Sequence, residues 1–305
     1  MSTPKPSTPR PSTQASYARR IARVTEHIAA HLNEPLDVER LAEVAHFSPW
    51  HFHRIYRATT GETVADAIRR MRLHRAAGEL LNTDASLERI ARRAGYGSLA
   101  AFSRAFAADY GMPPGHYRRH GRLAAPRPPK RPDDVTDRYD VTIAPFDGVR
   151  LAALEHRGDY QGIGTAFERA FAWAASRGLI GPGTRSFGIY YDDPESVPRA
   201  ELRAHAGLAI GADAVADDEV RIVEIPPLEC ASVVHKGPYA ELERPYRFLF
   251  GEWLAASGAE PADYPCFEEY LNDARTLPPS EWLTRIYLPL AHSQLEAMNR
   301  GSEPR

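Results

Sequence analysis

One glutamate stands among aromatic residues near the end of the chain, in the segment Phe267-Glu268-Glu269-Tyr270. Side chains alternate along a strand, which puts Glu268 and Tyr270 on one face and Glu269 on the other. A buried carboxylate beside aromatic rings would suit a cationic, apolar, flat ligand, through charge pairing, stacking and cation–π attraction. The alternative is that Glu268 is an exposed strand residue beside another acid. Because glutamates are seldom buried, their general distribution in proteins favours this alternative.

An internal repeat of about eighty residues surrounds this glutamate. Val141–Tyr160 aligns without gaps on Val220–Tyr239, and the residue equivalent to Glu268 in the first copy is Gly188. Two copies that pack with pseudo-two-fold symmetry leave a cleft between them, and such clefts are favoured ligand sites. The predicted ligand-binding residues are Glu268, Tyr270, Tyr160, Tyr190, Tyr239, Trp253 and Tyr287.

Each copy of this repeat is predicted to contain a strand, a helix and two more strands. The signals are clearest in the second copy, where β-rich runs cover 220–225 and 228–235. A helix is predicted from about Tyr239 to Ser257, followed by strands at Cys266–Leu271 and Trp282–Leu290. The fold expected for this half is therefore α+β, built from duplicated βαββ units.

The first half contains a different repeat, of about fifty residues. Asp37–Ala45 returns 49 residues later as Ser86–Ala94. Each copy predicts a short amphipathic helix, a tight turn, a second helix and a glycine that ends it. The predicted N-caps are Asp37, Ser48, Ser86 and Ser98, and the closing glycines are Gly61 and Gly111. This order of elements is the helix-turn-helix plan, so an all-α tandem helix-turn-helix domain is expected.

The second helix of a helix-turn-helix enters the major groove of double-stranded DNA with its outward residues. The predicted DNA-binding residues are Trp50, His51, His53, Arg54 and Arg57 in the first copy and Ser98, Ala100, Ser103 and Arg104 in the second. A helix from Val64 to Leu81 joins the copies and could hold them about 34 Å apart, one turn of DNA. Some of its arginines, at positions 69, 70, 72 and 75, are expected to contact phosphate and others to pair with acids. A single helix pair with a polar face is common, but two in tandem favour DNA binding.

Charge is distributed unevenly, although the net charge is only −2. Residues 17–131 carry 20 Lys plus Arg against 11 Asp plus Glu, whereas residues 132–305 carry 16 against 29. An excess of positive charge in the first half fits a polyanion such as DNA, although a solvated basic face would give the same count.

Composition divides the chain into five stretches. We expect a disordered tail at 1–16, the helix-turn-helix domain at 17–120, a Pro-rich linker at 121–138, the ligand-binding domain at 139–292 and a C-terminal tail at 293–305. Cys230 and Cys266 are far apart without CxxC spacing, so no disulfide, metal site or cofactor is expected. With neither a signal peptide nor a bilayer-length apolar run, a cytoplasmic location without a membrane partner is expected.

The stretch from Tyr17 to His120 resembles the DNA-binding domain of the AraC/XylS family. The second copy carries the signature: Ile90-Ala91-Arg92-Arg93-Ala94-Gly95-Tyr96-Gly97-Ser98, Phe102-Ser103-Arg104-Ala105-Phe106, Gly111, Pro113-Pro114 and Tyr117-Arg118. The resemblance implies base or phosphate contacts for Trp50, His53, Arg54, Ser103 and Arg104, with RNA polymerase as a possible further partner. His46 departs from the pattern, because the family usually has glycine at that turn and the second copy keeps Gly95.

Residues from about Tyr139 to Leu290 resemble the GyrI-like domain. The resemblance rests on Gly158-Asp159-Tyr160, Gly237-Pro238-Tyr239, Phe187–Pro194 and Cys266–Asp273. That family binds small molecules, often hydrophobic cations, through a central glutamate, and Glu268 stands at the matching position. The order of the two domains resembles the Rob-type regulators, which implies a small-molecule effector acting on a DNA-binding regulator of transcription.

Two other functions remain open at this point. Some GyrI-like domains resemble hydrolases that open strained electrophiles, and a buried glutamate beside a tyrosine could activate water. Fusion to a DNA-binding domain argues for sensing, so no catalytic residue and no enzymatic activity are expected. Alternatively, the acidic half could bind another regulator or a toxin target and take no small ligand at all.

Overall fold

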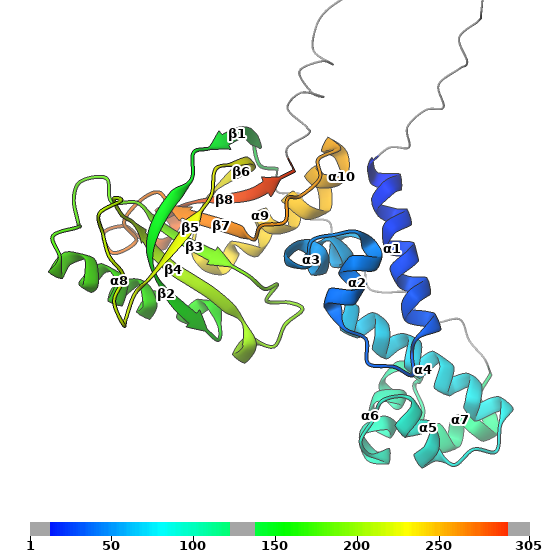
Figure 1. Cartoon of the computed structure of the whole chain (residues 1–305). Helices are drawn as coiled ribbons and strands as arrows, with labels where there is room; N and C mark the ends of the chain where they lie inside the picture. Colours follow the sequence, from blue (N-terminus) through cyan, green and yellow to red (C-terminus); the bar gives the residue numbers. More distant parts are fainter. Residues whose placement is uncertain (1–12, 123–137, 292–305) are drawn as a thin grey trace, which may run out of the picture. The chain divides into compact units, whose positions relative to one another are not determined.

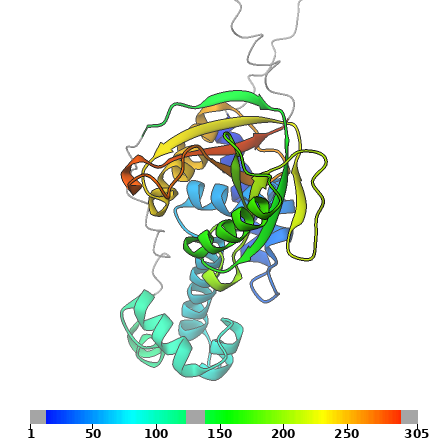
Figure 2. The ribbon, with the colours of Figure 1, turned by 90° about the vertical axis from the view of Figure 1, so that its left-hand side faces the viewer.

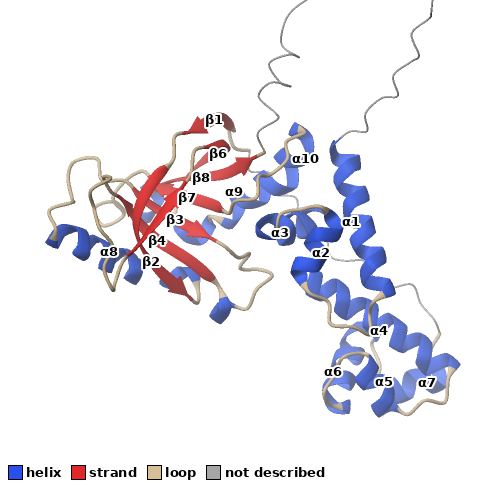
Figure 3. Ribbon diagram, viewed as in Figure 1, coloured by secondary structure: helices blue, strands red, loops and turns tan. Residues whose placement is uncertain are grey.

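The computed structural model describes residues 13–122 and 138–291. Within them, seven helices come first and all eight strands follow in the second half (Figure 1). Figure 3 distinguishes the helices from the strands by colour. The first helices are α1 (Thr13–Ala30), α2 (Val38–Ala45), α3 (Pro49–Thr60), α4 (Val64–Asn82), α5 (Leu87–Arg93), α6 (Leu99–Tyr110) and α7 (Pro114–His120). None of the described helices has both the length and the apolar character needed to span a membrane.

Contacts divide the described residues into two compact units. The helical unit comprises 20–46 and 56–122, and the sheet unit comprises 13–19, 47–55 and 138–291. The predicted N-terminal tail, linker and C-terminal tail fall mostly at 1–12, 123–137 and 292–305, outside the described residues. Helix α1 begins at Thr13, so helical structure starts inside the stretch where the sequence analysis expects a disordered tail.

In the helical unit, α5 and α6 form the second helix pair, which packs on α4 and α7. The buried core residues are Leu73, Ala76, Ala77, Leu80, Ile90, Ala91, Ala94, Phe102, Phe106 and Tyr117. Three of the four predicted caps are confirmed: Asp37 accepts the Glu39 amide, Ser86 Oγ accepts the Arg89 amide at 3.3 Å, and Ser98 Oγ accepts the Ala101 amide at 3.2 Å. The hydroxyl of the fourth, Ser48, instead donates to Asp263. Gly111 closes α6 in the left-handed conformation, with φ of 72°.

His46 ends α2 in the left-handed conformation, with φ of 53°. Its backbone amide donates to the carbonyls of Ala42 and Glu43 and so closes the helix. Gly95 has φ of 86° at the corresponding turn of the second pair. The turn therefore requires the conformation that glycine adopts freely, and a side chain in it costs about 1 kcal/mol. This explains why His46 stands out in the sequence.

The four arginines of α4 all have partners within the helical unit. Arg70 makes two hydrogen bonds to the Glu62 carboxylate, at 2.6 and 3.1 Å. The others pair as follows: Arg69 with Asp66, Arg72 with the carbonyls of Leu32 and Glu34, and Arg75 with the Arg93 carbonyl and Glu79. The expected acid pairing is present, and these side chains position the segments around α4.

The sheet unit contains one eight-stranded antiparallel sheet in the order β1-β6-β8-β7-β3-β4-β2-β5 (Figure 1). Its strands are β1 (Thr142–Phe146), β2 (Val149–Arg157), β3 (Ser186–Tyr190), β4 (Arg203–Ala209), β5 (Arg221–Ile225), β6 (Leu228–Lys236), β7 (Cys266–Tyr270) and β8 (Leu283–Leu290). Each repeat thus has two strands before its helix, one more than the predicted βαββ unit. The first strand of each repeat pairs with the second strand of the other, since β1 pairs with β6 and β5 with β2.

The sheet curls around an aromatic core. Phe146 from the edge strand β1 contacts Phe267 and Tyr287, with ring centroids 4.9 and 5.3 Å apart. Ile225 from the opposite edge strand β5 joins the same cluster of buried residues. Residues from both edges can share one core only if the sheet is curved, so this is its concave side.

The other face of the sheet is covered by helices. Helix α8 (Gly164–Ser176), which faces the viewer in Figure 2, packs its small residues and Trp173 on Leu154 and Ala206. The second repeat has α9 (Glu243–Arg247), a π-helical turn (Phe248–Trp253) and α10 (Leu254–Ser257) at the equivalent place. The helix predicted from Tyr239 to Ser257 is therefore present, but it begins at Glu243 and is interrupted by the π turn.

Candidate ligand site and DNA-binding residues

Glu268 lies on the pseudo-two-fold axis that relates the two repeats of the sheet. The repeats are offset by 80 residues here, and β3 pairs with β7 so that Gly188 faces its own equivalent, Glu268. Two large side chains cannot occupy the same place on an axis. A Cβ at Gly188 would already lie 2.9 Å from the Tyr270 hydroxyl and 2.7 Å from the Tyr190 ring. The sequence asymmetry at this position therefore makes room for a single carboxylate.

Three tyrosine hydroxyls surround this carboxylate. Tyr246 of α9 donates to Glu268 Oε1 at 3.0 Å, and Tyr270 donates to Oε2 at 3.1 Å. Since Tyr270 spends its only hydroxyl hydrogen on Glu268, the 2.6 Å contact between Tyr190 and Tyr270 has Tyr190 as its donor. The three hydroxyls form a directed network that ends on the glutamate.

Burial controls the protonation of this group. It raises the pKa of Glu268 to about 7, although the hydrogen bonds from Tyr246 and Tyr270 and the charge of Arg54 lower it. Burial also raises the pKa values of Tyr190, Tyr246 and Tyr270 well above 10, so these phenols remain neutral donors. Glu268 is only 3% exposed. The site thus holds a carboxylate that a nearby positive charge would help to ionise.

The network borders a cavity of about 860 Å³, within the range of small-molecule sites. Five of the seven predicted ligand-binding residues line it: Glu268, Tyr270, Tyr160, Tyr190 and Tyr239. Trp253 lies in the π turn and does not line this cavity. Tyr287 does not line it either, because it lies on the concave side of the sheet, where it stacks on Phe267 and donates to Glu269 at 2.8 Å.

Several residues of this cavity were not predicted from the sequence. Tyr246, which bonds the glutamate, occupies the position of Phe167 in the first repeat, and both line the cavity. A hydroxyl present in one copy only, like the carboxylate present in one copy only, is a signal that the alignment of the repeats contains. Phe171 and Arg54 also line the cavity.

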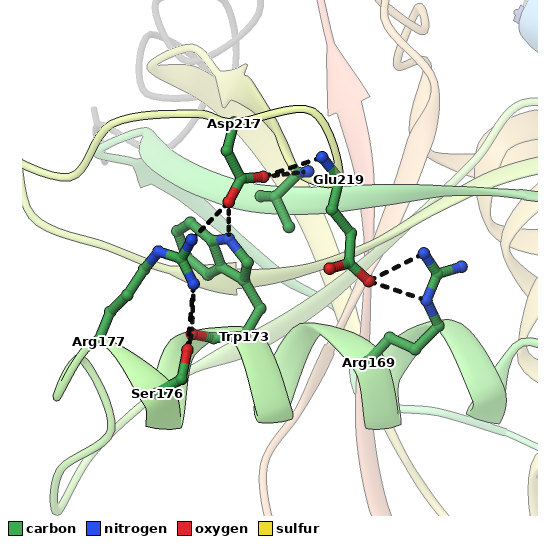
Figure 4. Close-up of polar contacts among 7 residues, drawn as sticks. Arg169, Trp173, Ser176, Arg177, Asp217 and Glu219 are labelled. Carbon is green, nitrogen blue, oxygen red and sulfur yellow. Dashed lines mark hydrogen bonds and ion pairs between the residues drawn. The ribbon is translucent and has the colours of Figure 1, made fainter.

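A polar cluster fastens α8 to the loop before β5 (Figure 4). Phe167 and Phe171 of the same helix form part of the cavity wall. Asp217 accepts the Trp173 indole N–H at 2.6 Å and the Arg177 guanidinium at 2.5 Å. The same carboxylate accepts two backbone amides that precede β5, from Glu219 and Val220. These hydrogen bonds join the loop before β5 to the outer side of α8 and so fix one wall of the cavity.

The predicted DNA-binding residues of the first helix pair, α2 and α3, are divided between the two units. Trp50, His51, His53 and Arg54 belong to the sheet unit, and Arg57 belongs to the helical unit. His51 is fully buried and Arg54 is 5% exposed, whereas the remaining three are half-buried. Burial and, to a smaller extent, the charge of Arg54 lower the pKa of His51 to about 3, so this imidazole is neutral.

The predicted residues of the second pair lie on the helical unit. Ser98, Ala100 and Arg104 are exposed, and Ser103 is half-buried. The Ser98 hydroxyl caps α6, so its first role is structural. Arg104 projects from the outward face of α6, opposite the buried Phe102 and Phe106, as a DNA-contacting side chain must.

Neither cysteine has the surroundings of a reactive thiol. Cys230 and Cys266 are buried, and burial raises the pKa of each thiol to about 12. Among residues 13–122 and 138–291, no group of three or more His, Cys, Asp or Glu side chains could hold a metal ion.

Comparison with known proteins assigns both halves of the chain. The family of GyrI-like small molecule binding domains matches residues 139–291, and a helix-turn-helix domain family matches residues 41–120. A DNA gyrase inhibitor of Edwardsiella piscicida is 33% identical over 164 residues, 50% of this chain and 99% of that protein. Regulatory protein SoxS of Salmonella typhimurium is 34% identical over 103 residues, 34% of this chain and 96% of that protein. The uncharacterized HTH-type transcriptional regulator YbfP of Bacillus subtilis is 40% identical over 102 residues, 33% of this chain and 35% of that protein.

Proposed function

The chain belongs to the family of proteins with a GyrI-like small molecule binding domain, and from that premise we propose that it is a ligand-responsive regulator of transcription. Its helix-turn-helix domain supplies the DNA binding, through Arg104, Ser103 and the predicted residues of the first pair. The cavity around Glu268 takes the effector. RNA polymerase is the proposed protein partner and the cytoplasm the proposed compartment, because a regulator of this kind acts where DNA is transcribed.

The observation that carries the proposal is the buried Glu268 carboxylate at the wall of an aromatic cavity. No ion pair to Glu268 is present among the described residues, and a buried carboxylate is costly to ionise, so a cationic ligand that reaches it gains a favourable charge interaction. The surrounding tyrosines offer ring faces and keep their hydroxyls on the glutamate. A lipophilic monocation, whose charge meets the carboxylate and whose rings meet the aromatic walls, fits this chemistry best.

The experiment is a calorimetric titration of the full chain with tetraphenylphosphonium at pH 8, where Glu268 is ionised. We expect Glu268→Gln to weaken binding at least about tenfold, because one charge-assisted contact is worth about 1.5–3 kcal/mol. Glu155→Gln, which removes an exposed carboxylate paired with Arg157, is the matched control and should bind as the wild type does. Equal affinity in the wild type and Glu268→Gln would contradict the proposal.

Hydrolysis is the second candidate, because a glutamate with a pKa of about 7 could act as a general base. Against it, both oxygens of Glu268 already accept a tyrosine hydroxyl, which leaves the carboxylate poorly placed to take a proton from water. We therefore propose binding without turnover. Turnover of an epoxide that is lost in Glu268→Gln but kept by a chain without residues 1–120 would reverse this choice.

A protein partner for the acidic half is the third possibility, and melting temperature separates it from ligand sensing. A cation that binds only the folded cavity raises the melting temperature as its concentration rises. If a panel of lipophilic cations leaves the melting temperature unchanged, the acidic half binds a protein and not a small cation.

A further inference from the structure

The first half of α3 and the residue before it bind loops of the sheet unit. Residues 47–55 belong to the sheet unit, and three side chains spaced one helical turn apart bind it. Ser48 Oγ donates to Asp263 Oδ1 at 2.8 Å, the His51 ring contacts the Tyr264 carbonyl at 3.0 Å, and Arg54 Nη2 donates to the Asp192 carbonyl at 3.1 Å. Two of these side chains, His51 and Arg54, are predicted to read DNA. The contacts therefore use part of the face that DNA binding requires.

Arg54 places its guanidinium at the aromatic wall of the cavity. Its Cζ atom lies 4.8 Å from the centre of the Tyr246 ring and 5.8 Å from that of Phe250, both within the range of cation–π attraction. Tyr246 is the same residue whose hydroxyl donates to Glu268. Arg54 and Glu268 both line the cavity. The chain thus supplies a cation of its own at the place where a cationic ligand would be bound.

The guanidinium of Arg54 does not use all of its hydrogen-bond donors. Nη1 of Arg54 is buried and has no hydrogen-bond partner among the described residues. Its neighbour Nη2 bonds a carbonyl and not a carboxylate. The charge of Asp193 stabilises this cation and raises its pKa, but a buried N–H without an acceptor is costly, so a ligand can displace the guanidinium from this position.

We propose that Arg54 is a built-in competitor of the effector. The ring of Tyr246 beside Glu268, here called the seat, binds either this guanidinium or a cationic ligand. A ligand that displaces the guanidinium frees the outward face of α3 for DNA. The inference rests on the proposed function and adds its regulation. Effector and DNA then favour the same state of residues 47–55, so each strengthens the binding of the other.

The test compares the affinity of the full chain and its variants for tetraphenylphosphonium. Removing the competitor raises the apparent affinity by the inverse of the fraction of molecules in which the seat is open. If that fraction is about one tenth, Arg54→Ala binds about ten times more tightly than the wild type. Arg40→Ala removes an exposed arginine of α2 and is the control, with unchanged affinity.

A second variant covers the case in which Arg54→Ala does not fold. Asp263→Ala takes away the acceptor of Ser48 but leaves Arg54 and the cavity intact, since Asp263 does not line it. Its affinity for tetraphenylphosphonium should rise about threefold, because docking of residues 47–55 is weakened. Its affinity for DNA without the cation should rise as well, since every predicted DNA-binding residue is present.

The outcomes separate this inference from the function on which it rests. Tighter binding by Arg54→Ala and Asp263→Ala supports the built-in competitor. Binding by the wild type and both variants with equal affinity, or weaker binding by the variants, overturns the competitor and leaves cation sensing in place. If neither the wild type nor the variants bind the cation, cation sensing is refuted, and the competitor is refuted with it.

Discussion

Gly188→Ala should disturb the tyrosine network around Glu268. The added Cβ would lie 2.7 Å from the Tyr190 ring and 2.9 Å from the hydroxyls of Tyr190 and Tyr270. These atoms must move, which breaks or lengthens the 2.6 Å hydrogen bond between the tyrosines and disturbs the one that Tyr270 donates to Glu268. A hydrogen bond to a charged group is worth about 1.5–3 kcal/mol, and overpacking a core costs about 1–3 kcal/mol.

We therefore expect the free energy of unfolding to fall by about 2–4 kcal/mol at pH 8, and affinity for tetraphenylphosphonium to fall at least about tenfold. Denaturant titration and calorimetry measure the two effects. Gly211→Ala is the control, because a Cβ there meets nothing within 4 Å and its change should stay within about 0.5 kcal/mol. A Gly188→Ala protein with wild-type stability and affinity would show that the tyrosine network does not support the site.

Four further changes test other parts of the account. Folding raises the pKa of Glu268 to about 7, so the wild type should lose stability as the pH rises from about 4.5 to 7. The expected loss is about 3 kcal/mol in the free energy of unfolding, relative to Glu268→Gln. Denaturant titrations that show no pH-dependent difference between the two proteins would refute the buried carboxylate. Asp217→Ala removes the acceptor of the Glu219 and Val220 amides, whose hydrogen exchange should accelerate at least about tenfold. Unchanged exchange would show that Asp217 does not hold this loop against α8. His46→Gly should raise the free energy of unfolding by about 1 kcal/mol in thermal melts, because it relieves a left-handed backbone, and a loss of stability would contradict that strain. Arg104→Ala should weaken DNA binding. If Arg104 contacts phosphate, affinity falls for all sequences and the slope of log affinity against log salt concentration decreases by about one; if it contacts a base, specificity is lost at one position. Unchanged binding would show that Arg104 does not contact DNA.

The periodicity of the sequence was sufficient to predict most of the fold. The fifty-residue repeat predicts the helices and their caps, and Ser86 and Ser98 cap α5 and α6 as expected. The eighty-residue repeat predicts the strands near Cys266 and Trp282 to within a residue or two. The exchange of β1 and β5 between the repeats was not predictable, because alternation within a strand does not identify its neighbour in the sheet.

The lining of the cavity was predictable in part. Glu268 and Tyr270 follow from the alternation along β7, and the asymmetry with Gly188 is visible in the alignment of the repeats. Tyr287 lies outside the cavity because its face depends on the register of β8 against β7, where it lies opposite Phe267 and not opposite Glu268.

The first helix pair shows a different limit of sequence reasoning. The amphipathic pattern predicts that the face of α3 with His51 and Arg54 is polar, but it does not predict which residues that face contacts. In the structure its partners are Asp192 and Tyr264, more than 130 residues away along the chain. Contacts of this kind depend on tertiary packing and leave no local signal.

The measurement that tests the central claim most directly is the affinity of the full chain for DNA, with and without tetraphenylphosphonium. The DNA would be a site selected from random sequences at fixed salt, since the affinity of such contacts falls steeply with salt. We predict that the cation tightens DNA binding about tenfold in the wild type and has no effect in Glu268→Gln. The same DNA affinity at every cation concentration, in a protein that demonstrably binds the cation, would contradict the account.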